Sequence, residues 1–217
     1  MQLYTTPGSP NSRKVMAVIN HLGLTVDIRQ LDFAAQETRK PFFLALNPNG
    51  MVPVLVDGDF CLWESNAINA YLADRSGGST LYPRDLEARA DINRWLLWEQ
   101  AHFNRSVGTL IFESVIKPMF GMGEASQALI DFCLADIGRF APVLEKRLQG
   151  RDTLVGDDVT IADYAMVCLE KYRGATAFDW SPFANINRYF DMIRALDAWK
   201  KVSAPDEAAT EPGLVLA

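Results

Sequence analysis

Histidine and cysteine are scarce in this sequence of 217 residues. The two histidines are His21 and His102, which are too few to suggest a zinc site. The three cysteines, Cys61, Cys133 and Cys168, are odd in number, far apart and not arranged as a CxxC pair. We therefore expect no metal site, and we interpret the cysteines as small buried side chains in a reducing compartment.

An excess of positive charge and a long apolar run are also missing. The chain has 21 Lys and Arg against 27 Asp and Glu, a formal net charge of -6. It therefore lacks the positive field that attracts nucleic acid or an anionic membrane surface. No apolar stretch approaches the length of a membrane span. Residues 1–20 contain turn-forming residues where a signal peptide has an apolar run. We expect a cytoplasmic protein that binds neither nucleic acid nor membranes.

The N-terminal part alternates between strand and helix patterns, whereas the C-terminal part contains only helix patterns. The expected order at the start is β-α-β-α-β-β-α, with strands near 2–6, 24–31, 52–56 and 60–62 and helices near 15–22, 36–46 and 65–73. Four helices are expected later: a long one around 95–115, kinked or ended near Pro118, then 129–148, 160–174 and 182–199. This order predicts a small mixed sheet covered by helices, followed by an all-helical domain.

The domain boundaries follow from a turn-rich stretch. Residues 74–85 are rich in Gly, Ser, Asp and Pro, which is typical of a linker. We predict a first domain over 1–76, a linker over 77–85, a helical domain over 86–203 and a tail over 204–217.

The first candidate site residue is Ser9, in the turn between the first strand and the first helix. Pro10 after it suits the first helical position, so Ser9 is expected to be the N-cap. A hydroxyl there can accept a backbone N–H and still donate its proton to an anion. The partial positive charge of the helix N-terminus would stabilise a thiolate at the same place. A simple helix cap explains Ser9 equally well at this point.

Two further motifs suit peptide binding. In Val52-Pro53, a cis bond at a strand start would leave the Val52 backbone groups facing outwards, ready to pair with an extended peptide. In Glu64-Ser65, helix N-terminal amides can bind a carboxylate while Glu64 holds an ammonium. Each motif also has a structural explanation, as a strand-start proline and as a helix cap.

Taken together and in this order, the three motifs resemble those of the cytosolic glutathione transferase family. The segment 154–163, Leu-Val-Gly-Asp-Asp-Val-Thr-Ile-Ala-Asp, is similar to the capping-box segment of that family's helical domain. The resemblance extends to about residue 201. It implies a thioredoxin-like α/β N-terminal domain, an all-α C-terminal helical bundle, and a homodimer with the helices around 65–73 and Trp95 at the interface.

The resemblance also implies roles for individual residues. Ser9 matches the catalytic serine of the serine-type classes, among them the delta and phi enzymes. Val52 and cis-Pro53 match the pair that binds the cysteinyl backbone of glutathione, and Glu64 and Ser65 match the residues that bind its γ-glutamyl end. Lys40, or else Arg39, is the candidate for the glycyl carboxylate. An electrophile site is expected on the long helix, at Phe103, Asn104, Leu110 and Ile111.

The expected activity is detoxification by conjugating the glutathione thiolate, as co-substrate, to a small, largely apolar electrophile. Two alternatives stay open. The bacterial beta-class cysteine is absent, and Ser9-Pro10-Asn11 resembles the Thr-Pro-Asn of the nu-like glutathione-dependent disulfide reductases. A non-catalytic glutathione-binding member of the family is the other alternative.

Overall fold

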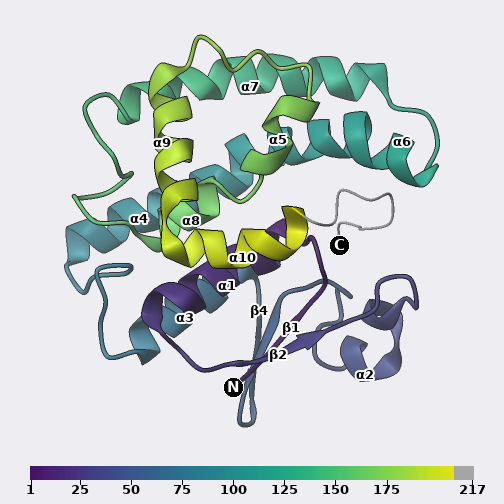
Figure 1. The fold of residues 1–217 in the computed structure, drawn as a ribbon, viewed down its shortest axis with the longest axis vertical. Coiled ribbons are helices and arrows are strands. Elements are labelled where there is room, and N and C mark those ends of the chain that lie inside the picture. Colours follow the sequence, from purple (N-terminus) through teal and green to yellow (C-terminus); the bar gives the residue numbers. More distant parts are fainter. Residues whose placement is uncertain (208–217) are drawn as a thin grey trace. The chain divides into compact units, whose positions relative to one another are not determined.

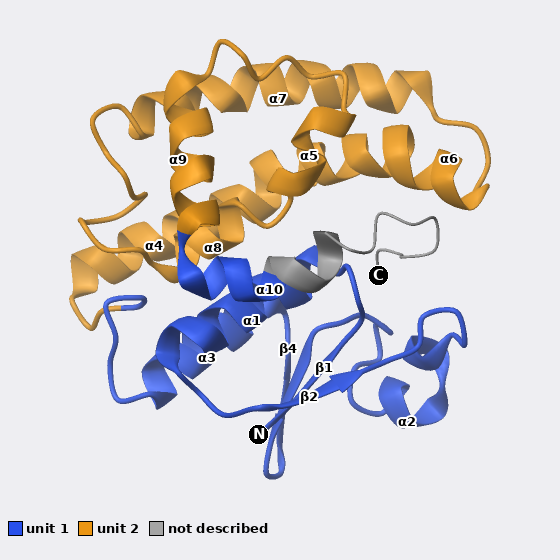
Figure 2. Ribbon diagram, viewed as in Figure 1, with its two compact units in different colours: residues 1–82, 196–217 blue, residues 83–195 orange. Residues whose placement is uncertain are grey.

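The computed structural model describes residues 1–207, which divide into two compact units. Unit 1 contains residues 1–82 together with the end of the chain from 196, and unit 2 contains residues 83–195 (Figure 2). No helix among the described residues is long and apolar enough to cross a membrane. The part of the predicted tail beyond residue 207 lies outside the described residues, and the predicted domain boundaries stay predictions.

Unit 1 is built on a four-stranded mixed sheet in the order β2-β1-β3-β4 (Figure 1). β1 and β2 are parallel, whereas β3 pairs antiparallel with both β1 and β4. Its elements are β1 Gln2–Thr5, α1 Pro10–Leu22, β2 Asp27–Gln30, η1 Glu37–Arg39, α2 Pro41–Leu44, β3 Val54–Asp57, β4 Phe60–Trp63, α3 Ser65–Arg75 and α10 Asp197–Glu207. The predicted thioredoxin-like domain is confirmed.

Helix α1 shows how local sequence sets the limits of an element. Ser9 is the N-cap and Pro10 the first helical residue, and the helix ends at Gly23, whose φ of 63° is left-handed. One face buries Val15, Val18 and Ile19. Contacts with α3 and α10 cover this helix within unit 1.

Unit 2 is helical, as predicted. Its elements are α4 Leu86–Trp98, η2 Glu99–Phe103, α5 Asn104–Ile111, η3 Phe112–Ile116, α6 Lys117–Phe120, α7 Gln127–Arg147, α8 Ile161–Met166, η4 Glu170–Ala175 and α9 Ala184–Ala195. The first five form one continuous helical run interrupted by two π-helical segments, η2 and η3.

Three predicted helices differ from the observed elements. The helix predicted over 36–46 is two short elements, η1 and α2. The long run ends near Pro118 as expected, at Phe120 before the left-handed Gly121. The helix predicted over 160–174 is two elements, because tighter i→i+3 bonds follow Met166. The helix predicted over 182–199 breaks at Leu196, so that α9 lies in unit 2 and α10 in unit 1.

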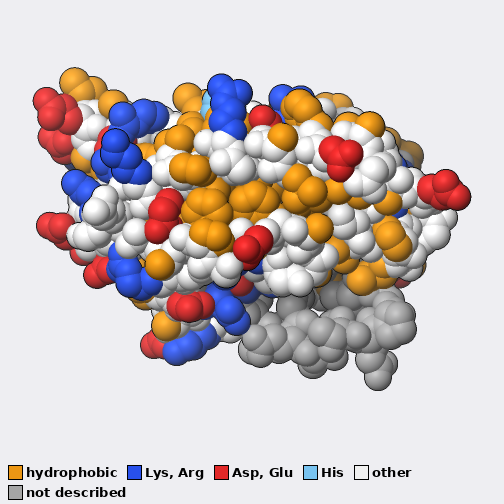
Figure 3. Space-filling model, turned by 90° about the horizontal axis from the view of Figure 1, so that it is seen from above, with side chains coloured by type: hydrophobic (Ala, Val, Ile, Leu, Met, Phe, Trp, Pro, Cys, Tyr) orange, Lys and Arg blue, Asp and Glu red, His pale blue; other side chains and the backbone are white. Residues whose placement is uncertain are grey.

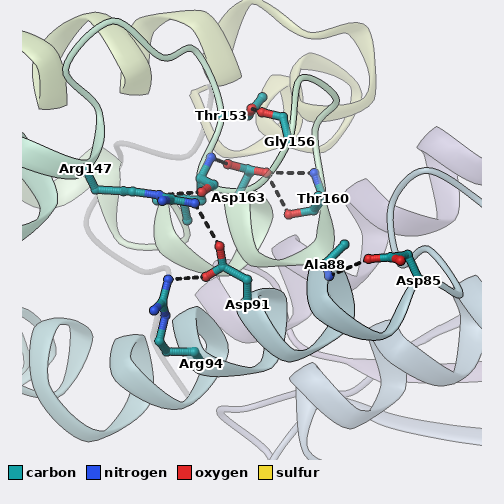
Figure 4. A network of polar contacts seen from close by, with 10 residues as sticks. Asp85, Ala88, Asp91, Arg94, Arg147, Thr153, Gly156, Thr160 and Asp163 are labelled. Carbon is teal, nitrogen blue, oxygen red and sulfur yellow. Dashed lines mark hydrogen bonds and ion pairs between the residues drawn. The ribbon is translucent and has the colours of Figure 1, made fainter.

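A fully buried carboxylate joins the segments of unit 2. Asp163 accepts hydrogen bonds from the N–H groups of Leu154 and Thr160, at 2.8 and 2.7 Å, and from the hydroxyls of Thr160 and Tyr189, at 2.8 and 2.9 Å. The contact with Thr160 is the predicted capping box of α8 (Figure 4). The loop before α8, the helix itself and α9 are thereby joined at one side chain.

Candidate functional site

The register of the sheet brings the predicted glutathione-binding segments of unit 1 to one edge. Tyr4 near the end of β1 pairs with Val54 at the start of β3, and Val54 also pairs with Trp63 at the end of β4. The segment with Ser9 follows β1, Val52 precedes β3, and Glu64 follows β4. The segment with Arg39 follows β2, which is parallel to β1. All four segments therefore start from the same edge of the sheet.

Ser9 caps α1 and keeps its own proton available. Its Oγ accepts the Ser12 N–H at 3.2 Å, and its carbonyl accepts the Arg13 N–H at 3.0 Å. Within the part of the chain that the structure describes, the Ser9 hydroxyl donates to no acceptor. Ser9 is 2% exposed and lies at the N-terminus of α1. The site thus combines a hydroxyl donor with the positive end of a helix.

The Val52-Pro53 peptide bond is cis. The Val52 side chain belongs to a small core cluster with Leu31, Phe43 and Val54. Val52 lies two residues before β3, outside the residues that pair with β1. Its backbone N–H and C=O form no hydrogen bond with another described residue. These groups suit an added extended peptide.

Glu64 and Ser65 differ in detail from the expected helix cap. Glu64, not Ser65, is the N-cap of α3, and its side chain makes no capping hydrogen bond. Glu64 has a φ of 73° and a ψ of 108°, a conformation that costs free energy for a residue with a Cβ atom. The hydroxyl of Ser65 donates to Oδ1 of Asn11, at 3.4 Å, and so joins the starts of α3 and α1. This contact could not be found from spacing, since the two residues lie far apart in the chain.

Lys40 and Arg39 have different surroundings. The Lys40 ammonium forms an ion pair with Glu37 at 3.2 Å. A hydrogen bond from the Asp32 N–H, and then one from Lys40, hold the pKa of Glu37 below its usual range. The Arg39 guanidinium instead lies against Gly50 in the loop before Val52, 2.9 Å from where a Cβ atom would stand. Glycine is favoured at position 50 because its φ of 65° is left-handed and because a Cβ atom would lie 3.1 Å from the Thr38 carbonyl.

The four residues predicted to face the electrophile are buried inside unit 2. Phe103, Leu110 and Ile111 are each 1% exposed, and Asn104 is 9% exposed. The amide of Asn104 donates to the Glu99 carboxylate at 2.7 Å and to the Ala165 carbonyl at 3.1 Å. Its polar group thus has partners within the helical unit, and its role toward an electrophile stays a prediction.

Over the described residues there is no group of three or more His, Cys, Asp or Glu side chains that could hold a metal ion.

Comparisons with known proteins agree with this arrangement. The family model "Glutathione S-transferase, N-terminal domain" matches residues 1–74, and "Glutathione S-transferase, C-terminal domain" matches residues 106–197. The chain is 37% identical over 165 residues to glutathione S-transferase 3 of Zea mays, covering 75% of this chain and 73% of the relative. It is 32% identical over 195 residues to a probable glutathione S-transferase of Oryza sativa subsp. japonica, covering 90% and 88%.

A solved structure is similar over the same length. The crystal structure of a glutathione transferase from Burkholderia graminis, with two glutathione molecules bound per subunit, is 28% identical. The alignment has a TM-score of 0.81 and covers 94% of this chain and 88% of that one.

Proposed function

The chain belongs to the glutathione S-transferase family, and from this premise we propose that it conjugates the glutathione thiolate to small, largely apolar electrophiles. The observation that carries the proposal is the sheet register, which gathers the segments with Ser9, Val52 and Glu64 at one edge of unit 1. The backbone groups of Val52, the Ser9 hydroxyl and the Glu64 carboxylate match the backbone, the thiol and the ammonium of glutathione, respectively.

Each residue has a defined part in this proposal. The free backbone groups of Val52 pair with the cysteinyl residue of glutathione, with cis-Pro53 following in the loop. Glu64 receives the γ-glutamyl ammonium, and the N–H groups at the start of α3, together with Ser65, receive its carboxylate. The strained backbone of Glu64 supports this role, because such conformations are often found at ligand sites. Ser9 then donates its hydroxyl proton to the sulfur.

Glutathione binding and activity test this proposal directly. Glu64→Ala should weaken glutathione binding at least tenfold, since the bound ammonium loses a charged partner. The measurement is calorimetric titration with glutathione. Glu124→Ala, which removes an exposed carboxylate from unit 2, is the control and should bind as the unchanged protein does. Equal affinity in the Glu64 and Glu124 variants would place the site elsewhere.

A second activity is favoured by one contact. Asn11 follows Ser9-Pro10 and is joined to Ser65, so Ser9 and Asn11 could both face a glutathione disulfide. Assays of one preparation with an aromatic halide and with a small disulfide, each with glutathione, separate the two activities. If the protein turned over the disulfide and not the aromatic halide, its function would be disulfide reduction and not conjugation.

For the glycyl carboxylate, Arg39 is the better-placed cation. Lys40 is already paired with Glu37, whereas Arg39 lies beside the loop that leads into Val52. Arg39→Ala should raise the Kd for glutathione about ten- to thirtyfold, and Lys40→Ala should change it less than twofold. Titration with glutathione and with γ-glutamylcysteine, which lacks the glycine, gives the measurement. The Arg39 effect should vanish for γ-glutamylcysteine. If Lys40→Ala raised the Kd more than Arg39→Ala does, Lys40 would be the residue that binds the glycyl carboxylate.

We also propose a homodimer, with the helices around residues 65–73 and Trp95 at the interface. Figure 3 shows hydrophobic side chains gathered in a band on one face. Of the two helices, α4 carries the exposed hydrophobic residues Leu86 and Leu97, and exposed apolar surface is typical of interfaces. A sedimentation mass of a single 24.2 kDa chain at micromolar concentration would contradict the dimer.

A further inference from the structure

Helix α10 belongs to unit 1 and packs against α1, the helix that Ser9 caps (Figure 1). Apart from Asp197, α10 lies beyond the residues that the family models match. Its Trp199 is 1% exposed and is among the largest fully buried side chains of the described residues. The last helix of the chain therefore buries a large aromatic side chain in the unit that carries the predicted glutathione site.

The start of α1 contacts Trp199 through Arg13. The guanidinium carbon of Arg13 lies 4.4 Å from the centroid of the Trp199 ring, and Arg13 is 4% exposed. A guanidinium over an indole ring is a favourable cation–π contact, which is stronger where solvent is excluded. A second contact lies near the other end of α1, where the side-chain amide of Asn20 donates to the Ala198 carbonyl at 3.3 Å. Helix α10 thus holds α1 near both of its ends.

The residue that contacts Trp199 also closes the first turn of α1 on Ser9. The Arg13 N–H donates to the Ser9 carbonyl at 3.0 Å, and the Ser12 N–H donates to Ser9 Oγ at 3.2 Å. The direction of the Ser9 hydroxyl therefore depends on where this turn lies, and the contact with Trp199 restricts the turn at Arg13. Such placement matters for a reacting group, because a displacement of about 1 Å can cost about a hundredfold in rate.

We propose that Trp199 is a positioning residue for conjugation, which acts through Arg13 on the first turn of α1 and so aims the Ser9 hydroxyl at the sulfur of glutathione. The inference rests on the proposed function, because it requires that Ser9 donates to that sulfur. It adds α10 to the parts of the chain that prepare the reaction, although no residue of α10 touches glutathione in this proposal.

The test compares Trp199→Leu with Trp199→Phe in the full chain. Leucine removes the aromatic face beneath Arg13, whereas phenylalanine keeps one. Trp199→Leu should lower kcat/KM for conjugation at neutral pH about tenfold and move the titration of the bound thiol to higher pH, while the Kd for glutathione changes less than about twofold. Trp199→Phe should keep most of the rate. The measurements are steady-state rates, thiolate absorbance of bound glutathione against pH, and calorimetric titration with glutathione.

Two further variants separate positioning from folding. Arg13→Met removes the guanidinium but keeps Trp199 and the backbone N–H, so it should act as Trp199→Leu does even if the latter variant does not fold. Trp180→Leu is the matched control, since Trp180 is also buried and Arg173 lies over its ring, 5.6 Å from the centroid, in unit 2. This control should lose stability without changing the titration of the bound thiol.

The double variant Ser9→Ala/Trp199→Leu identifies the residue through which Trp199 acts. It should match Ser9→Ala in rate and in thiol titration, because the hydroxyl that Trp199 positions is already absent. A further loss in the double variant would show that Trp199 acts on the thiol by another route. Equal losses in Trp199→Leu and Trp199→Phe, or an unchanged thiol titration in Trp199→Leu, would leave Trp199 as a packing residue.

These three results would overturn the inference and leave the proposed function intact. The proposed function has a different point of failure. If the bound thiol titrated in Ser9→Ala as it does in the unchanged protein, Ser9 would not activate glutathione, and the inference about Trp199 would fail with that role.

Discussion

Replacing Ser9 by alanine is expected to slow conjugation at neutral pH by about ten- to a hundredfold while glutathione still binds almost normally. A hydrogen bond to a charged group contributes roughly 1.5–3 kcal/mol, which corresponds to this range of rates. The groups that bind the peptide, Val52, Glu64 and the start of α3, are unchanged in the variant. The substitution should therefore lower the reactivity of the bound thiol and leave the affinity for glutathione nearly unchanged.

The pH dependence follows from the same hydrogen bond. A free thiol has a pKa of about 8.5, and the Ser9 hydroxyl with the N-terminus of α1 should lower this value for bound glutathione. Without the hydroxyl the thiol pKa rises, so less thiolate exists at neutral pH. As the pH is raised, the thiol ionises unaided and the variant should recover part of its rate. Thiolate absorbance of bound glutathione against pH measures this directly.

Two control variants separate activation from helix capping. Ser126 is also a serine N-cap, on α7, where its Oγ accepts the Leu129 N–H. Ser126→Ala should lose stability, on the order of 1 kcal/mol, without changing the thiol titration. Ser9→Thr keeps a hydroxyl and should restore much of the rate. Identical titration curves for Ser9→Ala and the unchanged protein would reduce Ser9 to a helix cap, and Tyr4 or Asn11 would become the candidate donor.

Local signals predicted the elements of unit 1 well. Alternating apolar residues, the turn Asp57-Gly58-Asp59 and the Ser9-Pro10 start correspond to observed strands, hairpin and helix. The same signals misplaced the boundaries of unit 2. The apolar residues keep a helical spacing across Leu196, so the sequence pattern does not show the break between α9 and α10. Pro142 lies inside α7, so a proline in this sequence does not by itself mark the end of a helix.

The sequence indicates local conformation around the candidate site, but it does not show which neighbouring side chains pair once the chain is folded. Ser9 and the cis bond at Val52-Pro53 follow from their immediate neighbours. The choice between Arg39 and Lys40 needs the position of Glu37, which only the folded loop supplies. Asn104 was expected to face an electrophile because it is polar on an apolar face. Its partner Glu99 became evident only with the π-helical segment between them.

The largest effect on stability is expected for Asp163. Asp163→Ala should lower the free energy of unfolding by about 3–5 kcal/mol, because it leaves the N–H groups of Leu154 and Thr160 and the Tyr189 hydroxyl without an acceptor inside the protein. Burial raises the pKa of the Asp163 carboxyl, so removing it also relieves a desolvation cost. That relief offsets only part of the loss, since each of three buried donors costs about 1–3 kcal/mol when unsatisfied. The measurement is the thermal unfolding midpoint, which should fall by roughly 10 °C for a chain of this size.

Asp163→Asn distinguishes the need for acceptors from the need for charge. Each carboxylate oxygen accepts one backbone N–H, from Leu154 at Oδ1 and from Thr160 at Oδ2. Whichever way the amide of the asparagine is turned, its NH₂ group therefore faces a backbone N–H. This variant should lose nearly as much stability as Asp163→Ala, although it fills the same space. Tyr189→Phe removes one donor and leaves both backbone bonds, so it should cost only about 1 kcal/mol. If Asp163→Asn unfolded at the same temperature as the unchanged protein, the four hydrogen bonds would not be what joins the loop, α8 and α9.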